Sequence, residues 1–246
     1  MMKLIIITFL MICLPLSEEP IAILIQATGN TSRCISDDCD SIYPGSLLFK
    51  NDAIVTSKDS FTKIRFLENS LDIMVYDKSK IIINGNRKEQ EFEESIMVSY
   101  GNAFVGTVGS KNTIETPHIS LSNNVPSSIY ITIDKNNNEK VYIISGEVVS
   151  NENSFLDEDT SVYGGSLVLF NNKSVTFSNS PRRVVKSIIN NQISHNVDIS
   201  ADILKEYNLI SSVGKLQSKS GMITIPLRSS SGEFKNLIIE YYINEK

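Results

Sequence analysis

The sequence has no tryptophan, only two histidines and only three cysteines among its 246 residues. Aromatic residues make up 8% of the chain, so few side chains are available to stack on sugar rings or nucleic-acid bases. Zinc sites draw their ligands mainly from cysteine and histidine, and the two histidines, His118 and His195, stand in separate stretches. The composition therefore disfavours a nucleic-acid, carbohydrate or zinc-binding protein.

Positive charge is also scarce. The formal net charge is −5 at pH 7, and the only adjacent arginines are Arg182 and Arg183. Binding to phosphate backbones needs clustered lysine and arginine side chains, and two neighbouring charges make no patch. We therefore expect no nucleic-acid partner.

Long apolar runs are absent except at the N-terminus. Lys3 is followed by an almost wholly apolar stretch from Leu4 to Leu16, which is typical of a secretory signal peptide and too short for a membrane-spanning helix. We predict a signal peptide over residues 1–17, cleaved after Ser17, and a periplasmic or secreted protein. An uncleaved N-terminal anchor is the alternative. Cys13 suggests a lipoprotein, but a lipid-attachment site would have a small residue where Ile12 stands.

The part of the chain from Gly45 to Ile83 reads as short strands separated by polar corners. Within it, Leu71, Ile73 and Val75 alternate with Asp72, Met74 and Tyr76, which is the period of a strand with one buried face. Regular short strands with turn signals indicate an all-β sandwich, barrel or solenoid, and we expect a solenoid-like or sandwich-like stack of short strands. We expect one common core that contains Ile64, Phe66, Leu71, Ile73, Val75, Ile131, Ile133, Val141 and Ile143.

Two blocks of this pattern resemble the FecR domain, the periplasmic part of iron-citrate-type sensor proteins. The first block consists of Gly45, Asp52, Ile54, Thr56, Ser60, Ile64, Phe66, Leu71, Ile73 and Ser79. The second consists of Gly101, Glu115-Thr116-Pro117, Tyr130 to Asp134 and Val141 to Val149. The family usually has Gly-Thr ahead of the penultimate strand, where this chain has Ser127 and Ser128.

The resemblance covers residues 20–178 and implies a FecR-like β domain with a role in envelope signalling. Transducing members of the family place a cytoplasmic anti-sigma segment and a spanning helix before this domain, and here only about 17 residues precede it. We therefore expect a ligand-binding, protein-binding or scaffolding module. The alternative is a sensor component that is anchored by an uncleaved N-terminus and works with a separate signalling protein.

Residues 180–246 read as a small C-terminal α+β region. Val184, Val185, Ile188 and Ile189 lie at helical spacing after Pro181. A second short helix is predicted over residues 200–207, with Ser200 as its N-cap, and two strands follow over residues 222–228 and 236–243. Helix should be confined mainly to residues 181–207.

Cys34 and Cys39 lie close together in an elaborated turn of a chain that we expect to be exported. An oxidising compartment favours a disulfide between them. A metal site with Asp37, Asp38 and Asp40 is the rival interpretation, but these residues lack the spacing and central glycine of a calcium loop. We interpret the aspartates as a solvated turn and expect no metal.

No motif in the chain carries catalytic chemistry. A Gly-x-Ser-x-Gly elbow is missing, and the two histidines read as separate surface residues. Gly106 and Gly109 resemble a phosphate loop only loosely, because no lysine follows the second glycine. Glu89, Glu91, Glu93 and Glu94 read as a solvated strand edge. We therefore expect no catalytic site, no cofactor and no enzyme activity.

Overall fold

The structure of the protein is a computed structural model. It describes residues 19–36, 38–68, 71–88, 91–108, 111–123, 125–151, 158–171, 173–195, 199, 201–207, 209, 219–228 and 234–243. The predicted signal peptide over residues 1–17 lies outside this range, as do Asp37, Glu89, Gly109 and Ser200.

The chain is mostly β, which confirms the predicted fold class. Its first strands are β1 (Ala22–Thr28), β2 (Thr31–Ile35), β3 (Asp38–Ser41), β4 (Leu47–Leu48), β5 (Ala53–Thr56), β6 (Phe61–Phe66), β7 (Leu71–Val75), β8 (Lys80–Lys88) and β9 (Glu91–Thr107). They are followed by β10 (Asn112–Glu115), β11 (Ser120–Asn123), β12 (Ser127–Ile133), β13 (Glu139–Ser145), β14 (Glu147–Ser150), β15 (Thr160–Tyr163), β16 (Ser166–Asn171) and β17 (Ser174–Asn179). Two helices, α2 (Arg182–Ser194) and α3 (Ala201–Glu206), and a hairpin of β18 (Lys219–Arg228) and β19 (Phe234–Ile243) complete the described chain.

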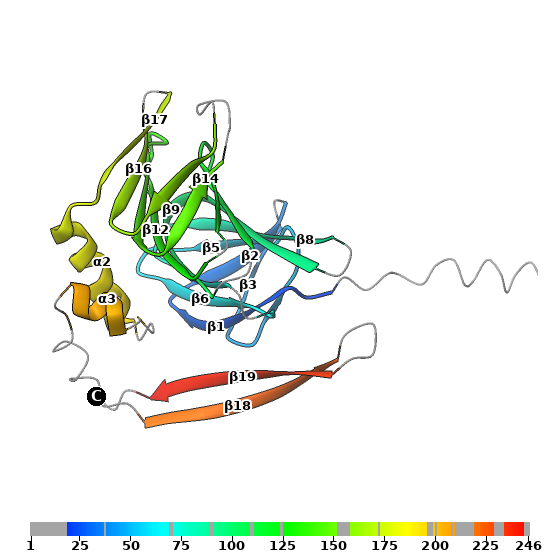
Figure 1. The fold of residues 1–246 in the computed structure, drawn as a ribbon. Coiled ribbons are helices and arrows are strands. Elements are labelled where there is room, and N and C mark those ends of the chain that lie inside the picture. The colour runs from blue at the N-terminus through cyan, green and yellow to red at the C-terminus, as the bar shows by residue number, and fades with distance from the viewer. Residues whose placement is uncertain are drawn as a thin grey trace, which may run out of the picture.

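The strands form two sheets joined through the long strand β9 (Figure 1). Sheet A has the order β4-β1-β6-β7-β9-β12-β13-β16-β17 and uses the second half of β9. Sheet B has the order β3-β2-β5-β8-β9-β10-β11-β14-β15 and uses the first half. All these pairs are antiparallel except β9 with β10, so the whole assembly is a mixed sheet folded over on itself.

One hydrophobic core receives side chains from both sheets. Each strand of sheet A alternates between this core and the outer face, so Ile73 and Ile143 point inward while Met74 and Tyr142 point outward. All nine residues that the sequence pattern placed in a common core belong to it, which confirms that prediction: Ile64, Phe66, Leu71, Ile73, Val75, Ile131, Ile133, Val141 and Ile143.

Three of the corners at which the chain crosses between the sheets have the same local structure. Gly29, Gly101 and Gly146 each have a positive φ at such a crossing, and each lies against a serine. Those serines are Ser60, Ser79 and Ser127, and each hydroxyl donates to the carbonyl two residues before it. We call these three glycine–serine pairs the serine corners. Only glycine combines the positive φ with so close an approach of a second backbone.

The serine corners explain two elements of the sequence pattern. Ser60 Oγ accepts from Asn30 N at 2.9 Å and Ser79 Oγ accepts from Asn102 N at 2.7 Å, so each serine fixes the strand that leaves its corner. Ser127 stands where the FecR pattern usually has Gly-Thr. Its hydroxyl donates to the Val125 carbonyl, and its Oγ also lies within hydrogen-bonding distance, 3.1 Å, of the Glu147 carbonyl oxygen. It therefore occupies the same structural position as the other two serines.

The structure differs from two local signals of the sequence. Asn84-Gly85-Asn86 has the composition of a turn, but all three residues pair with β9 inside a hairpin that continues to Lys88. A long ladder of backbone hydrogen bonds outweighs the turn preference of Asn-Gly. The cysteine-containing segment is also more regular than the predicted turn, because β2 and β3 form a hairpin with Cys34 directly opposite Cys39.

Helices α2 and α3 pack on the outer face of sheet A. Val185, Ile188 and Ile189 of α2 are buried, and they form a second hydrophobic cluster with Met74 and Tyr76. Other members of this cluster are Phe61, Phe104, Tyr142, Ile144, Leu167, Ile203, Leu204, Tyr207 and Leu209. Helix within residues 181–207 was predicted correctly, and Figure 1 shows both helices at one side of the sheets.

The helices change the expected burial of β7. The alternation along this strand predicted one buried face, but Met74 and Tyr76 are also buried, because α2 covers the outer face of the sheet at this point. Only Asp72, at the start of the strand, keeps partial exposure on that face. The division into a β domain over residues 20–178 and a C-terminal region over residues 180–246 stays a prediction.

Candidate functional site

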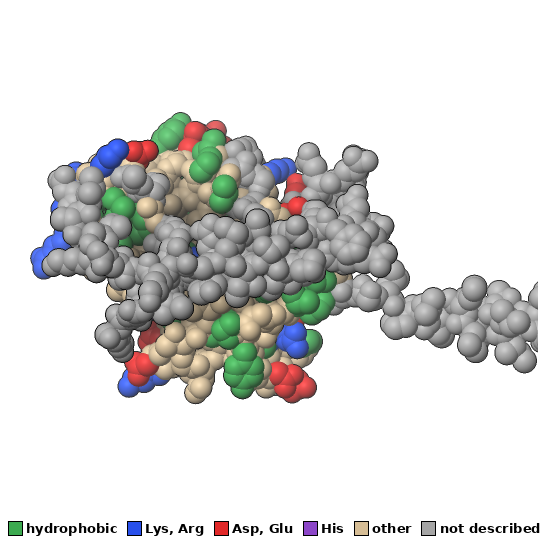
Figure 2. Space-filling view, turned by 90° about the horizontal axis from the view of Figure 1, so that it is seen from below, with side chains coloured by type: hydrophobic (Ala, Val, Ile, Leu, Met, Phe, Trp, Pro, Cys, Tyr) green, Lys and Arg blue, Asp and Glu red, His purple; other side chains and the backbone are tan. Residues whose placement is uncertain are grey.

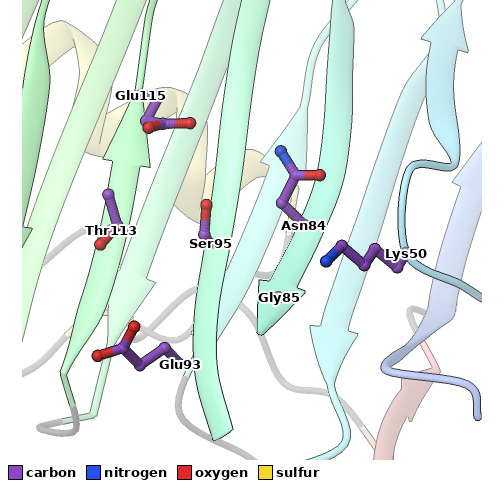
Figure 3. A pocket seen from close by; sticks show the side chains of 7 residues that line it. All are labelled: Lys50, Asn84, Gly85, Glu93, Ser95, Thr113 and Glu115. Atoms are coloured by element: carbon purple, nitrogen blue, oxygen red, sulfur yellow. The ribbon is translucent and has the colours of Figure 1, made fainter. Parts of the chain in front are cut away.

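The outer face of sheet B carries a polar hollow of about 320 Å³ (Figure 3). Its lining consists of Lys50, Asn84, Gly85, Glu93, Ser95, Thr113 and Glu115. Three of these residues form one row across neighbouring strands, since Asn84 pairs with Ser95 and Ser95 pairs with Thr113. Their side chains share a face because paired residues of adjacent strands point the same way. We call this feature the polar hollow.

Charges of both signs border the polar hollow. Lys50 comes from the loop between β4 and β5, while Glu93 and Glu115 lie on β9 and β10. Lys111 approaches Glu93 with its Nζ 3.1 Å from Oε1. Neither histidine nor cysteine lines the hollow, so its hydroxyls have no imidazole or thiolate beside them. Such a surface can form hydrogen bonds and ion pairs with a polar partner.

His118 is not the lone surface residue that the sequence suggested. Its Nδ1 lies 2.6 Å from Oε1 of Glu139, a fully buried carboxyl group on β13. The imidazole ring stacks on Phe170 with ring centroids 3.8 Å apart. Thr116 donates its hydroxyl to the other carboxyl oxygen of Glu139. Sequence reasoning missed this cluster because 21 residues separate the histidine from the glutamate.

The order of groups in this cluster does not match a catalytic triad. In a triad the imidazole stands between the carboxylate and the hydroxyl, so that it can take the proton of the nucleophile. Here the carboxyl group of Glu139 stands between His118 and Thr116. The Thr116 hydroxyl also accepts from Ile119 N at 2.9 Å, within the turn that joins β10 and β11. The arrangement holds this turn against sheet A.

His195 is likewise built into the packing, in this case of α2 on sheet A. Its ring stacks on Phe61 with centroids 4.2 Å apart and meets Tyr76 edge-on. Burial lowers the pKa of His195, because it disfavours the charged imidazolium. Gln192, one turn earlier, donates its side-chain amide to the hydroxyl of Tyr76. The predicted separate surface histidine is therefore a helix-docking residue.

Glu94 contradicts the prediction of a solvated glutamate edge. It is only 1% exposed, and neither of its carboxyl oxygens has a hydrogen-bond partner among the described residues. Burial raises its pKa to about 8, and the nearby carboxylates of Glu68 and Asp72 add to the shift. Its neighbour Glu93 is only half-buried, which is closer to the predicted solvated strand edge. The strand period explains the difference, because consecutive residues point to opposite faces.

The raised pKa of Glu94 predicts that stability falls as the pH rises. The unfolded chain releases this proton near pH 4.5, whereas the folded protein keeps it until about pH 8. This contribution is complete below the unfolded pKa and is lost as the pH rises through the folded pKa. Between these values the free energy of unfolding should fall by at most about 1.4 kcal/mol per pH unit. Urea unfolding of the wild type and Glu94→Gln at several pH values measures the slope.

The Glu94→Gln variant should lose most of this slope, because its side chain does not titrate. Glu93→Gln is the matched control and should keep the wild-type slope, since Glu93 points to the opposite face and pairs with Lys111. An unchanged slope in Glu94→Gln would show that Glu94 is not the titrating group.

Cys34 and Cys39 form a disulfide in the structure, across the β2–β3 hairpin. Their Cα atoms are 4.1 Å apart, and only four residues lie between them in the sequence. A bond across directly paired residues fixes a hairpin that already exists. The thiol groups are consumed by this bond, so they are not available as metal ligands.

Replacing Cys34 by serine should lower the free energy of unfolding by about 2 kcal/mol or less, because the closed loop is short. Denaturant unfolding of Cys34→Ser and Cys39→Ser measures the effect, and the two variants should agree. Asp40→Ala, an exposed change in the same hairpin, serves as the control. A decrease in the free energy of unfolding well above about 3 kcal/mol would mean that the disulfide stabilises more of the fold than this hairpin.

Surface charge, clusters of potential metal ligands and helix length bear on the possible partners of the described residues. Figure 2 shows basic and acidic side chains scattered over the described part of one face, without a patch of one sign. Among the described residues, no group of three or more potential ligands from His, Cys, Asp and Glu is placed to hold a metal ion. No helix in the described ranges is long and apolar enough to cross a membrane.

The chain is thus a two-sheet β protein with helices on one outer face. No protein-family model and no curated protein matches its sequence. Among solved structures, it is similar to two crystal structures of a putative anti-sigma factor from Parabacteroides distasonis, with TM-scores of 0.45 and 0.47 and identities of 11% and 9%. Each alignment covers 56% of this chain and 64% of that one, so it spans less than two thirds of that protein. A similarity at this level transfers no function.

Proposed function

We propose that the chain is a non-catalytic, exported module of the cell envelope that binds another protein or an envelope ligand. The polar hollow on sheet B is the observation that carries this proposal. It combines an amide, two hydroxyls and two carboxyl groups on strands of sheet B with the ammonium group of Lys50 from the loop between β4 and β5. The lining supplies no imidazole or thiol, and its charged groups, Lys50, Glu93 and Glu115, can form ion pairs with a polar partner.

Export and the link to signalling rest on the sequence. The predicted signal peptide over residues 1–17 favours a location in the periplasm or outside the cell, and the Cys34–Cys39 disulfide is compatible with an oxidising compartment. The FecR resemblance over residues 20–178 favours a protein partner. The second candidate function is an envelope sensor component that keeps its N-terminus as an anchor and passes its signal through a separate protein.

A cross-linking experiment in living cells tests the proposed binding surface. A photo-reactive amino acid is placed at Thr113 in the polar hollow and, as a control, at Asn136 in the exposed turn between β12 and β13. We expect a discrete cross-linked product from position 113 and none from position 136.

Reversing one charge of the polar hollow makes the experiment specific. Glu115→Lys should remove the cross-link from position 113, whereas Lys135→Glu on the exposed turn should leave it unchanged. The amounts of folded protein must be equal in all variants. Cross-links that persist in Glu115→Lys, or that appear equally from both positions, would show that the hollow is not the binding surface.

A further inference from the structure

Strand β17 is an exposed edge of sheet A without the features that usually protect an edge. Along the described residues it pairs only with β16, and every side chain except Val175 is exposed. Its sequence Ser-Val-Thr-Phe-Ser-Asn contains no charge and no proline. The other edges differ, because β3 carries Asp38 and Asp40, β4 has only two residues, and β15 has only four and directly follows Glu158 and Asp159. Charged side chains and short strands are common features that keep an edge strand from pairing with another chain.

The register shows which backbone groups β17 offers to a further strand. Ser180 N donates to the Gly165 carbonyl at 2.7 Å, one step beyond the end of the β16–β17 ladder and in the same register, so a backbone hydrogen bond between the two segments falls at this position. Hydrogen-bonded and non-hydrogen-bonded pairs alternate in an antiparallel ladder. The N–H and C=O groups of Ser174, Thr176 and Ser178 therefore point to β16. Those of Val175, Phe177 and Asn179 point to the open edge.

We propose that β17 pairs antiparallel with β17 of a second copy of this chain, with Thr176 on the two-fold axis. In this register the outward backbone groups of Val175 bond to those of Phe177 in the second copy, and the reverse pair follows by symmetry. Figure 1 shows β17 at the border of its sheet, so the two copies of sheet A become one continuous sheet.

The side chains of β17 are self-complementary in this register, which singles out a second copy as the occupant. On the face toward the core, each Val175 lies opposite a Phe177, a β-branched and aromatic pair that stabilises sheets. On the other face Thr176 lies opposite Thr176, and Ser174 lies opposite Ser178. No like charges meet, because the strand is uncharged and Lys173, just before it, lies opposite Asn179.

Sedimentation equilibrium of the purified exported protein tests the proposal. The wild type should show a dimer that grows with protein concentration. Thr176→Lys and Thr176→Glu each bring two like charges together on the two-fold axis and should be monomeric over the same range. Thr176 is exposed, so neither change should disturb the fold. An equimolar mixture of the two variants should recover the dimer, because opposite charges then meet on the axis.

The matched control is Ser161→Lys, an exposed change on β15 of sheet B, which should dimerise like the wild type. A wild-type protein that stays monomeric at its highest soluble concentration overturns the proposal. A dimer that survives in both Thr176 variants, or that fails to return in their mixture, overturns the proposed register. None of these results depends on the polar hollow, so the outcome is independent of the proposed function.

Discussion

Truncating Phe66 to alanine is expected to lower the free energy of unfolding by about 3 to 5 kcal/mol. Phe66 is fully buried at the end of β6, where it pairs with Ala22 of β1 and belongs to the core between the two sheets. The substitution removes an aromatic ring from a close-packed interior and leaves a cavity that surrounding strands cannot fill without breaking their ladders. Ile73→Ala, on the adjacent strand β7, should cost about 2 to 5 kcal/mol for the same reason.

Denaturant unfolding with a two-state analysis measures these effects, and Ser161→Ala is the control, since Ser161 is exposed on β15. It should change stability by no more than about 0.5 kcal/mol. Asp72→Ala is not a neutral control, because Asp72 accepts two hydrogen bonds of 2.7 Å from Arg65. Equal losses in Phe66→Ala and Ser161→Ala would contradict a single core between the sheets.

Gly101→Ala is expected to cost about 2 to 5 kcal/mol, although it adds only one methyl group. Gly101 has φ = 87°, and an added Cβ would lie 2.6 Å from Ser79 Cα and 2.7 Å from the Lys78 carbonyl oxygen. These are backbone atoms, which cannot rotate away. Strand β9 passes from sheet B to sheet A at this residue, so a local shift would disturb the pairing of both halves.

Two glycines serve as matched controls for Gly101→Ala. Gly106, in the same strand, has an ordinary φ, and its added Cβ would meet nothing closer than 3.9 Å, so Gly106→Ala should be nearly neutral. Gly45 has φ = 93° but nothing within 4 Å, so Gly45→Ala should show the cost of the backbone conformation alone, about 1 kcal/mol. If Gly101→Ala lowered the free energy of unfolding by no more than Gly45→Ala does, the backbone at this corner would be able to move and make room for the added methyl group.

Strand periodicity made much of the fold predictable. Alternation identified the inward-facing residues such as Ile64 and Ile131, because a strand with one face in a core has a period of two. It failed where a second layer covers the sheet, as at Met74 and Tyr76. The burial of those residues depends on α2, which follows more than 100 residues later, and no local pattern encodes that contact.

The residues that suggested a FecR domain are mostly structural in this chain. Ser60 and Ser79 close the serine corners, and the buried side chain of Asp52 accepts from Phe49 N at 2.8 Å within a turn. Such residues mark where a chain must bend, so they carry information about fold but little about function. The polar hollow could not be predicted, because Lys50, Asn84 and Glu115 come from separate elements and assemble only through the strand register.

Buried polar groups were equally hidden from the sequence. Glu94 and Glu139 look like solvated strand residues, yet both are almost fully buried. Alternate residues of a strand face the core, so whether a glutamate is buried depends on whether its position is odd or even along the strand. Around Glu94 both sets of positions carry charged residues, so the sequence does not show which set faces the core. Glu139 begins β13, where the preceding turn contains polar residues from Asp134 onward.

The central claim is that the chain works as an exported envelope module, and the state of the mature protein tests it most directly. Cells should be fractionated, and the protein analysed by intact mass and N-terminal sequencing without reductant. We predict a periplasmic or secreted protein that begins at Glu18 and has Cys34 linked to Cys39. A protein found in the cytoplasm with Met1 intact and both thiols free would contradict the claim.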